Sequence, residues 1–316
     1  MTSCRYISRI VLSAALALLL TRAGLSQVQV PTPELPISAH PHPHVHVNEW
    51  EESMNVTEQE NISKSFPFPA AGERRKLTID DVWGSVHVVG GSGDQVQLVA
   101  KKTIRAQSKE DLELAKKEVS LDVTQQGSLL KFYVNGPFRC QCDCGCGTRE
   151  HQTYIVKYDF EVQVPRDVDL TARTVNDGDV EVQGVAGQYS IHNVNGPVEM
   201  TNIAGSGSAK TVNGELKVLF QDNPPADSSF TTVNGDVDLY FLPKLSADFR
   251  FKTFNGEVFT DFQMSALPAR QPVEEHQNGK FVFHADRYSG GRIAAGGPEI
   301  KIETLNGDIH IRERHD

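Results

Sequence analysis

One short phrase recurs six times in the second half of this chain, and its spacing limits the folds that the chain can adopt. The phrase reads Thr-Val-Asn-Gly, then an acid or proline, then an apolar residue, with small variations. Its copies occupy residues 174–180, 193–198, 211–216, 232–237, 253–258 and 304–309. The asparagines of the first five copies are 19, 18, 21 and 21 residues apart, taken as differences between Asn176, Asn195, Asn213, Asn234 and Asn255. A fixed period of about twenty residues is typical of stacked repeats.

The residues after each Asn-Gly alternate in polarity, which predicts strands with one buried and one solvated face. In one copy Leu216, Val218 and Phe220 are apolar, while Glu215 and Lys217 are charged. Asn and Gly tolerate the positive φ that a sharp corner requires. We therefore expect structural turns at Asn195, Gly196, Asn213, Gly214, Asn234, Gly235, Asn255, Gly256, Asn306 and Gly307.

The repeat predicts an all-β fold, a repetitive β-solenoid of the right-handed parallel β-helix type with about 20 residues per coil. An Asn-Gly between alternating runs is also a strong hairpin signal, so an antiparallel β meander or sandwich is the alternative. One short helix is expected at residues 108–119, where Ser108 begins a capping-box pattern. The long gap between Asn255 and Asn306 leaves room for a further coil and an excursion, with a hairpin at residues 277–280.

The N-terminus has the pattern of a secretory signal peptide, which we expect to span residues 1–26. Arg5 and Arg9 are followed by an apolar run over residues 10–20 and then by small residues. The alternative is an N-terminal membrane anchor, which is disfavoured because this run is short for a bilayer span. We expect an exported protein of the periplasm, the cell envelope or the extracellular space.

The charge of the chain bears on its partners. Its formal net charge is -10, and removal of residues 1–26 takes away three arginines and no acid, which changes the charge to -13. An acidic protein repels phosphate backbones and anionic lipids, so we expect neither nucleic acid nor an anionic membrane as a partner. We expect no membrane span in the mature chain, because no later apolar run is long enough. A surface component, a glycan or an envelope protein is the expected partner.

Residues 27–61 have the composition of a disordered linker, rich first in proline and histidine and then in acids. Histidines stand at every second position in this segment, at His40, His42, His44 and His46. Imidazoles on a mobile segment can bind zinc or copper. The alternative is a solvated segment that has no metal role.

Residues 138–151 form a cysteine-rich insertion between two expected strands. Its cysteines are Cys140, Cys142, Cys144 and Cys146. In an exported protein such cysteines are expected to form disulfides, with three possible pairings or a pairing to another chain. Alternatively, their thiolates could bind zinc or copper, or take part in redox chemistry. Apart from zinc or copper at these residues and at the histidine tract, we expect no cofactor.

The repeated Thr-Val-Asn-Gly-Asp-Val phrase, behind a signal peptide and an initial strand-turn-strand, resembles the bacterial putative adhesin family known as domain of unknown function 4097 (DUF4097). The resemblance extends over about residues 62–316 and is strongest at 211–239 and 304–311. It implies an exported β-solenoid domain without an agreed active site. The cysteine-rich insertion and the histidine tract depart from the family pattern.

Three classes of function follow. The first is a non-enzymatic binding or structural protein of the cell envelope or exterior, because no catalytic triad, metallohydrolase or phosphate-loop motif occurs. The second is a metal-handling or redox protein that uses the cysteine-rich insertion and the histidine tract. The third is a polysaccharide-active enzyme, whose carboxylates would come from the repeated acids. These acids are Asp179, Asp236, Asp308, Glu215 and Glu257.

Overall fold

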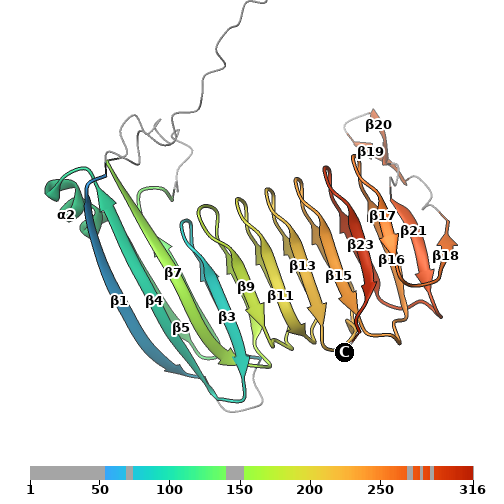
Figure 1. Cartoon of the computed structure of the whole chain (residues 1–316), viewed down its shortest axis with the longest axis horizontal. Helices are drawn as coiled ribbons and strands as arrows, with labels where there is room; N and C mark the ends of the chain where they lie inside the picture. The colour runs from blue at the N-terminus through green and yellow to red at the C-terminus, as the bar shows by residue number, and fades with distance from the viewer. Residues whose placement is uncertain are drawn as a thin grey trace, which may run out of the picture. The chain divides into compact units, whose positions relative to one another are not determined.

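The computed structural model describes residues 54–68, 74–139, 153–268, 273–277, 280–284 and 288–315, with the backbone alone at 273–277 and 280–284. These ranges contain two large sheets, a separate hairpin and one helix (Figure 1). We call the ten-stranded sheet A and the eleven-stranded one sheet B.

The strands of each sheet do not follow their order in the chain. In spatial order, sheet A contains β1 (Val56–Pro67), β4 (Gln95–Ala106), β7 (Tyr154–Pro165), β3 (Val86–Gly91), β9 (Val180–Gln183), β11 (Val198–Ile203), β13 (Leu216–Phe220), β15 (Val237–Phe241), β23 (Ile309–Glu313) and β17 (Val258–Thr260). Sheet B contains β18 (Met264–Leu267), β21 (Ser289–Ile293), β16 (Ala247–Lys252), β22 (Glu299–Glu303), β14 (Ser228–Thr231), β12 (Gly207–Lys210), β10 (Tyr189–His192), β8 (Asp169–Arg173), β2 (Lys76–Asp80), β6 (Leu129–Asn135) and β5 (Ser120–Gln126). The hairpin is β19 (Val273–Gln277) with β20 (Lys280–His284), and the helix is α2 (Lys109–Glu118).

Each coil of the repeat consists of one strand in sheet B followed by one strand in sheet A. Successive coils are β8–β9, β10–β11, β12–β13 and β14–β15, and the strands of neighbouring coils pair in parallel. The predicted β-solenoid is therefore confirmed, and an antiparallel meander is wrong for the repeats. Antiparallel pairing is found at the two ends, where β1, β4 and β7 pair at one end and β16, β21 and β18 at the other.

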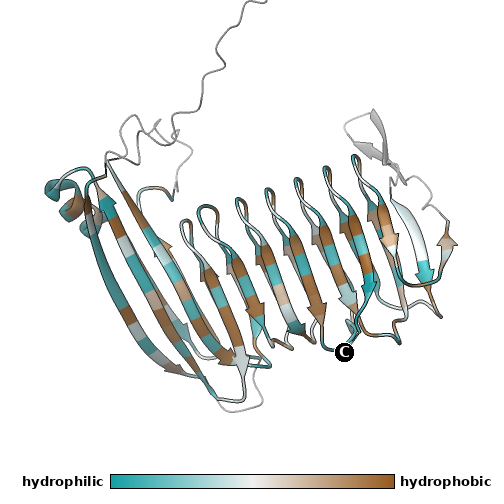
Figure 2. Cartoon of the chain, viewed as in Figure 1, coloured by the Kyte–Doolittle hydropathy of each residue, from teal (hydrophilic) through white to brown (hydrophobic). Residues whose placement is uncertain are grey.

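The core lies between the two sheets. Equivalent apolar residues of neighbouring coils form continuous buried rows, such as Val180, Val198, Leu216, Val237 and Ile309 in sheet A. Phe220 of β13 meets Phe230 of β14 edge-on across the core, with ring centroids 6.1 Å apart. Figure 2 shows the resulting alternation of hydrophobic and hydrophilic residues along the strands. Burial of each such side chain contributes about 2 kcal/mol, so the stacking of coils supplies most of the stability.

The last coil of the chain does not occupy the last place in the stack. β23 lies between β15 and β17 in sheet A, and β22 lies between β14 and β16 in sheet B. The coil near Asn306 is therefore inserted between the coils near Asn234 and Asn255. Residues 264–293 contribute β18 and β21 to the edge of sheet B and the hairpin β19–β20, which confirms the hairpin predicted at 277–280.

The N-terminal end of the stack is interleaved in the same way. The coil β2–β3 lies between β6–β7 and β8–β9. The helix α2 begins after the N-cap Ser108 and packs Leu112 and Ala115 against β4, β7 and β1, which confirms the predicted helix. Over the described residues, no helix has the length and apolar character that crossing a membrane would require.

Strand β1 begins at Val56, inside the segment expected to be linker. It pairs along its whole length with β4 at the edge of sheet A, and most of its side chains are exposed. Backbone pairing with β4 holds most of this strand, and only Val56, Ile62 and Phe66 pack against the core. Residues 57–61 are all exposed, which is why they show no apolar periodicity.

Candidate functional site

The predicted turn asparagines form a ladder of side-chain hydrogen bonds along the coils. Nδ2 of Asn195 donates to Oδ1 of Asn176 at 2.8 Å, and Nδ2 of Asn213 donates to Oδ1 of Asn195 at 2.8 Å. The same bond links Asn234 to Asn213, Asn306 to Asn234 and Asn255 to Asn306. Each net hydrogen bond contributes about 1 kcal/mol, so these asparagines hold the turns of adjacent coils in register.

The turn glycines are required mainly because adjacent coils approach closely. A Cβ at Gly214 would lie 2.2 Å from the carbonyl oxygen of Gly196, and a Cβ at Gly256 would lie 1.9 Å from that of Gly307. Among the five predicted turn glycines, only Gly235 and Gly307 have the expected positive φ, of +151° and +154°. The close approach of a neighbouring backbone is the reason that applies to all five.

Buried threonines complete the turns. Oγ1 of Thr232 donates to the carbonyl oxygen of Gly214 at 2.9 Å, and Oγ1 of Thr211 donates to that of Gly196 at 2.8 Å. In the one copy that lacks threonine, Nδ2 of Asn193 donates to the carbonyl oxygen of Gly178 at 3.0 Å. The Thr-x-Asn-Gly phrase thus links each coil to the next through side-chain hydrogen bonds and close backbone contact.

The acids that follow the turns bind backbone amides of the adjacent coil. Oδ1 of Asp236 accepts from the N–H of Asp308 at 2.8 Å, and Oδ1 of Asp308 accepts from the N–H of Glu257 at 2.8 Å. Oδ1 of Asp159 accepts from the N–H of Ser85 at 3.2 Å near the other end. These repeated acids therefore have a structural role in the stack.

The residues predicted to bind metal lie outside the described part of the chain. These are Cys140, Cys142, Cys144 and Cys146 of the cysteine-rich insertion and His40, His42, His44 and His46 of the histidine tract. Disulfides and zinc or copper binding at these positions remain predictions, as does the signal peptide.

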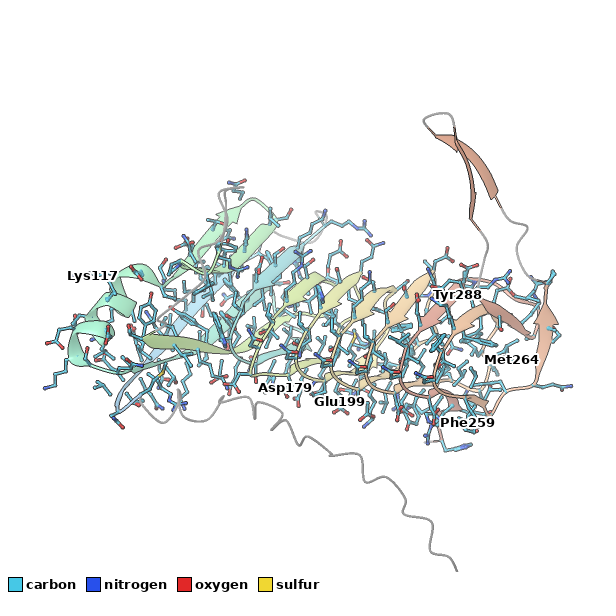
Figure 3. The ribbon with its side chains drawn as sticks, turned by 90° about the horizontal axis from the view of Figure 1, so that it is seen from above. Lys117, Asp179, Glu199, Phe259, Met264 and Tyr288 are labelled. Atoms are coloured by element: carbon cyan, nitrogen blue, oxygen red, sulfur yellow. The ribbon has the colours of Figure 1, made fainter. Side chains whose placement is uncertain are left out.

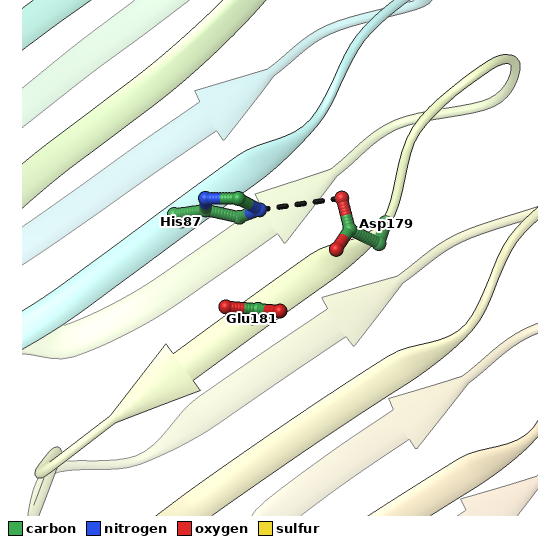
Figure 4. A group of neighbouring side chains, drawn as sticks. All are labelled: His87, Asp179 and Glu181. Atoms are coloured by element: carbon green, nitrogen blue, oxygen red, sulfur yellow. Dashed lines mark hydrogen bonds and ion pairs between the residues drawn. The ribbon is translucent and has the colours of Figure 1, made fainter.

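On the outer face of sheet A, Asp179 departs from the other acids by facing a histidine. His87 of β3 is in register with Glu181 of β9, and Asp179 lies directly before β9. Nε2 of His87 is 3.2 Å from Oδ1 of Asp179 (Figure 4). Both side chains are about one-third exposed, at 38% and 33%. One ligand atom from each of the three residues lies within 4.8 Å of the other two.

The surroundings of Asp179 favour its charged form. Partial burial opposes ionisation, but hydrogen bonds from Ser85 and His87 outweigh it and hold the pKa of Asp179 below its ordinary value. A hollow extends from His87 and Glu181 over Gln183, Glu199 and Thr201 on the same face. The cluster is therefore a preformed group of an imidazole and two carboxylates beside an open hollow.

The rest of this face is acidic, and its charged groups pair with one another. Nζ of Lys217 is 3.0 Å from Oε1 of Glu199, and the Arg312 guanidinium is 3.2 Å from Asp238. Partial burial, together with repulsion from Asp238 and Asp236, raises the pKa of Glu215 above its ordinary value. Figure 3 places Asp179, Glu199 and Phe259 along this side of the coils and Tyr288 along the other.

The outer face of sheet B carries a row of hydroxyl groups instead. The row runs in register over five neighbouring strands through Thr78, Thr171, Ser190, Ser208 and Ser229. All five are half-buried, and a hollow lies over Thr78, Thr171 and Ser190. Lys131 and Lys301 occupy the same row at its two ends.

A row of bases runs beside the hydroxyl row. Arg173, His192 and Lys210 are exposed and stand in register on β8, β10 and β12. Within the described ranges, none of the three forms an ion pair with a carboxylate. Although the His192 side chain is exposed, neighbouring atoms displace part of the water around its ring. This partial loss of hydration, with repulsion from Arg173 and Lys210, lowers the pKa of His192 below its ordinary value. This face therefore offers cations and hydroxyl groups at the strand spacing of about 4.8 Å.

The stack of Thr-x-Asn-Gly coils corresponds to a known family. Residues 166–312 match the family model described as Toastrack DUF4097. This segment is a Toastrack domain. The match confirms the resemblance seen in the sequence and begins directly before β8, so that β1 to β7 and α2 precede the matched part of the Toastrack domain.

Several solved structures are similar to this chain at low sequence identity. One is titled a putative cell adhesion protein from Clostridium sporogenes, with 11% identity, 81% of this chain and 100% of that chain covered, and a TM-score of 0.40. Another is titled a putative adhesin from Parabacteroides distasonis, with 10% identity, 81% and 97% covered, and a TM-score of 0.21. These TM-scores are too low to support an argument about the Toastrack domain. No curated protein matches the chain.

The sequence pattern predicts neither the cluster on the outer face of sheet A nor the hydroxyl row on that of sheet B. Trp83 pairs with Asn176, so the phrase around Trp83 is equivalent to the first copy of the repeat. Asp177 adds one residue to that copy, at a φ of +57°, and this hides the equivalence of His87 and Glu181. On sheet B, Ser190 and Ser208 each stand three residues after a turn glycine, Gly187 and Gly205, which is the signal that marks the hydroxyl row.

Proposed function

We propose that the protein is an exported, non-enzymatic binding protein and that the outer face of sheet B binds an extended acidic polysaccharide. The observation that supports this is the hydroxyl row of Thr78, Thr171, Ser190, Ser208 and Ser229 beside the bases Arg173, His192 and Lys210. The signal-peptide pattern of residues 1–26 supports export.

The chemistry of the two rows matches a polymer of sugar acids. Lysine and arginine form charge-assisted hydrogen bonds with carboxylates, and serine and threonine hydroxyls can donate to and accept from sugar hydroxyls. The groups recur at every strand, so a chain of repeated units lying across the strands meets the same chemistry several times. Several weak contacts along one ligand add up to useful affinity.

Sheet B is favoured over sheet A because its central cations are available. On sheet A, Lys217 and Arg312 are already paired with Glu199 and Asp238. Sheet A also carries an excess of acids, which repels an anionic polymer. Asp80, the acid in register with Arg173, is paired with Arg139. Among the described residues no carboxylate is paired with Arg173, His192 or Lys210, so these three groups are able to bind an anion.

The non-enzymatic part of the proposal is supported by the use of the repeated acids. Asp236 and Asp308 hold backbone N–H groups of adjacent coils, as described above. A carboxylate in that position serves the stack, whereas a glycosidase needs a pair of carboxylates free to act on one sugar bond.

The proposal is tested by binding to polygalacturonate, a linear acidic polysaccharide, in the presence of EDTA so that metal ions cannot bridge the two. Replacing Arg173 and Lys210 together by alanine should weaken binding at least tenfold, because two charge-assisted contacts are lost. The matched control replaces Lys157 and Lys217 on sheet A by alanine, which removes the same charge from the opposite face. Dextran, an uncharged polysaccharide, should bind more weakly than polygalacturonate.

Two outcomes would contradict the proposal. An equal loss of affinity in both double variants would show that only the net charge matters. Unchanged binding after replacement of Arg173 and Lys210 would place the ligand elsewhere.

A further inference from the structure

We propose that His87, Asp179 and Glu181 form a zinc-binding site on the outer face of sheet A. This site is independent of the polysaccharide-binding surface proposed on sheet B, and it does not involve the cysteine-rich insertion or the histidine tract.

The fold brings the three residues together from distant parts of the chain. Because β3 and β9 are parallel neighbours, His87 and Glu181 stand side by side in the same row and point to the same face. Asp179 lies two residues before Glu181, so its side chain points to that face as well (Figure 4). The rigid pairing of two strands fixes the position of the Cα atoms before any ion binds.

The distances suit a small divalent ion. Zinc binds histidine nitrogen at about 2.0 to 2.1 Å and carboxylate oxygen at about 2.0 to 2.2 Å, which separates neighbouring ligand atoms by about 3.3 Å. His87 Nε2 and Asp179 Oδ1 are already 3.2 Å apart. All three ligand atoms lie within 4.8 Å of one another, and Glu181 is an exposed side chain that can rotate inward.

The types of ligand favour zinc over calcium or magnesium. Imidazole suits zinc, whereas calcium and magnesium take oxygen ligands. Three protein ligands leave the fourth tetrahedral position open, as in zinc sites that bind water or a further ligand. That position would face solvent on the side of the hollow over Gln183, Glu199 and Thr201.

The neighbouring charged groups on β7 add negative charge, and the nearby base is paired with other acids. Glu161 of β7 stands in register with His87 on the side opposite Glu181. Lys157, the nearby base from β7, is paired with Asp159 and Asp177 rather than with Asp179. The negative potential of these strands raises the local concentration of cations.

A second histidine on the same face provides an internal comparison. His310 of β23 is in register with Asp238, but Asp238 is bound by Arg312 at 3.2 Å. The His310 ring is stacked on Phe259, with centroids 5.0 Å apart. His310 therefore lacks the free carboxylates that surround His87, although both stand on sheet A next to an acid.

The test uses the full chain with the other candidate metal ligands removed. Serines replace Cys140, Cys142, Cys144 and Cys146, and asparagines replace His40, His42, His44 and His46. After removal of metal with EDTA and exchange into chelator-free buffer, titration with zinc by calorimetry should show one equivalent bound. His87→Asn and Glu181→Gln should each weaken binding at least tenfold. His310→Asn, at the second histidine on this face, is the matched control and should leave it unchanged.

Circular dichroism and thermal unfolding check that each variant is folded. If the eightfold background does not fold, the natural chain is titrated instead, and His87→Asn and Glu181→Gln should each remove one equivalent of zinc. The proposal is wrong if zinc binding is the same with and without His87, or if the background binds no zinc. Binding of calcium in preference to zinc would also contradict it, because calcium takes oxygen ligands and the His87 imidazole would then not bind the ion.

Discussion

Glycine is required in the Asn-Gly turns because the backbone of one coil touches that of the next. Gly214 shows this most clearly, since its φ lies outside the positive region and only the approach of the Gly196 carbonyl oxygen, 2.2 Å from an added Cβ, excludes a side chain. An alanine can adopt the backbone conformation there, but the coils must then separate. Glycine is therefore required at this position by the neighbouring coil and not by the backbone conformation of the turn.

Gly214→Ala should therefore destabilise the protein by about 3 kcal/mol, the upper part of the range for an overpacked site. The free energy of unfolding is measured by urea titration. Gly93→Ala is the control, because an added Cβ at Gly93 meets no atom within 4 Å. A Gly214→Ala variant as stable as Gly93→Ala would contradict the close-packed turn.

His192 makes the stability depend on pH. Its pKa is lowered from 6.5 by partial loss of hydration and by the adjacent Arg173 and Lys210, so the folded state binds a proton less readily than the unfolded state. The contribution of neutral His192 to the free energy of unfolding is therefore fully present above pH 6.5, and it is lost as the pH falls through the pKa of the folded state.

The stability of the natural protein minus that of His192→Gln should accordingly decrease between pH 7 and pH 5. Urea unfolding at each pH measures the difference. A difference that stays constant over this range would contradict the lowered pKa.

The strands that follow the Asn-Gly turns were predictable because two local signals coincide there. The turn residues mark the start of β13, β15 and β23, and alternation such as Leu216, Val218 and Phe220 marks the buried face. The strands of sheet B lack the turn phrase, and β10, β12 and β14 in the middle coils are only four residues long. Their register, and with it the hydroxyl row, depends on pairing between coils, which a single segment of sequence does not encode.

The candidate sites were less predictable than the strands. The sequence indicates Asp179 only as one of several repeated acids, and it does not single out His87. Their contact joins β3 to β9 across a separation of 92 residues in the sequence. The two strands pair because the coil β2–β3 lies beside the coil β8–β9. The repeat period does not predict this position of β2–β3 in the stack.

Interleaving at both ends distinguishes this fold from a stack built in chain order. The last coil, β22–β23, fills the space between β14–β15 and β16–β17. It contributes Ile300, Ile302, Ile309 and Ile311 to the core, all fully buried. Since neighbours on both sides hydrogen-bond to this coil, the C-terminal part of the stack cannot be completed until the end of the chain is available.

Deletion of residues 299–316 should therefore disrupt the coils on both sides of the gap. Four buried isoleucines are lost, each worth about 2 kcal/mol, and the facing strands lose their partners. Hydrogen exchange should show loss of protection in β14 to β17, and the midpoint of thermal unfolding should fall steeply. Deletion of β1, an edge strand with mostly exposed side chains, is the comparison and should have a smaller effect.

A synthetic peptide of residues 297–316 gives the sharper measurement, because it separates the missing coil from general damage to the chain. Added to the truncated protein, the peptide should restore protection in β15 and β17, the two strands that β23 joins. A peptide with Ile309 and Ile311 replaced by aspartate should not, since charges cannot be buried in the core without large cost. If the truncated protein kept its protection without any peptide, β15 and β17 would have to pair directly, and the inserted coil would not be required for the stack.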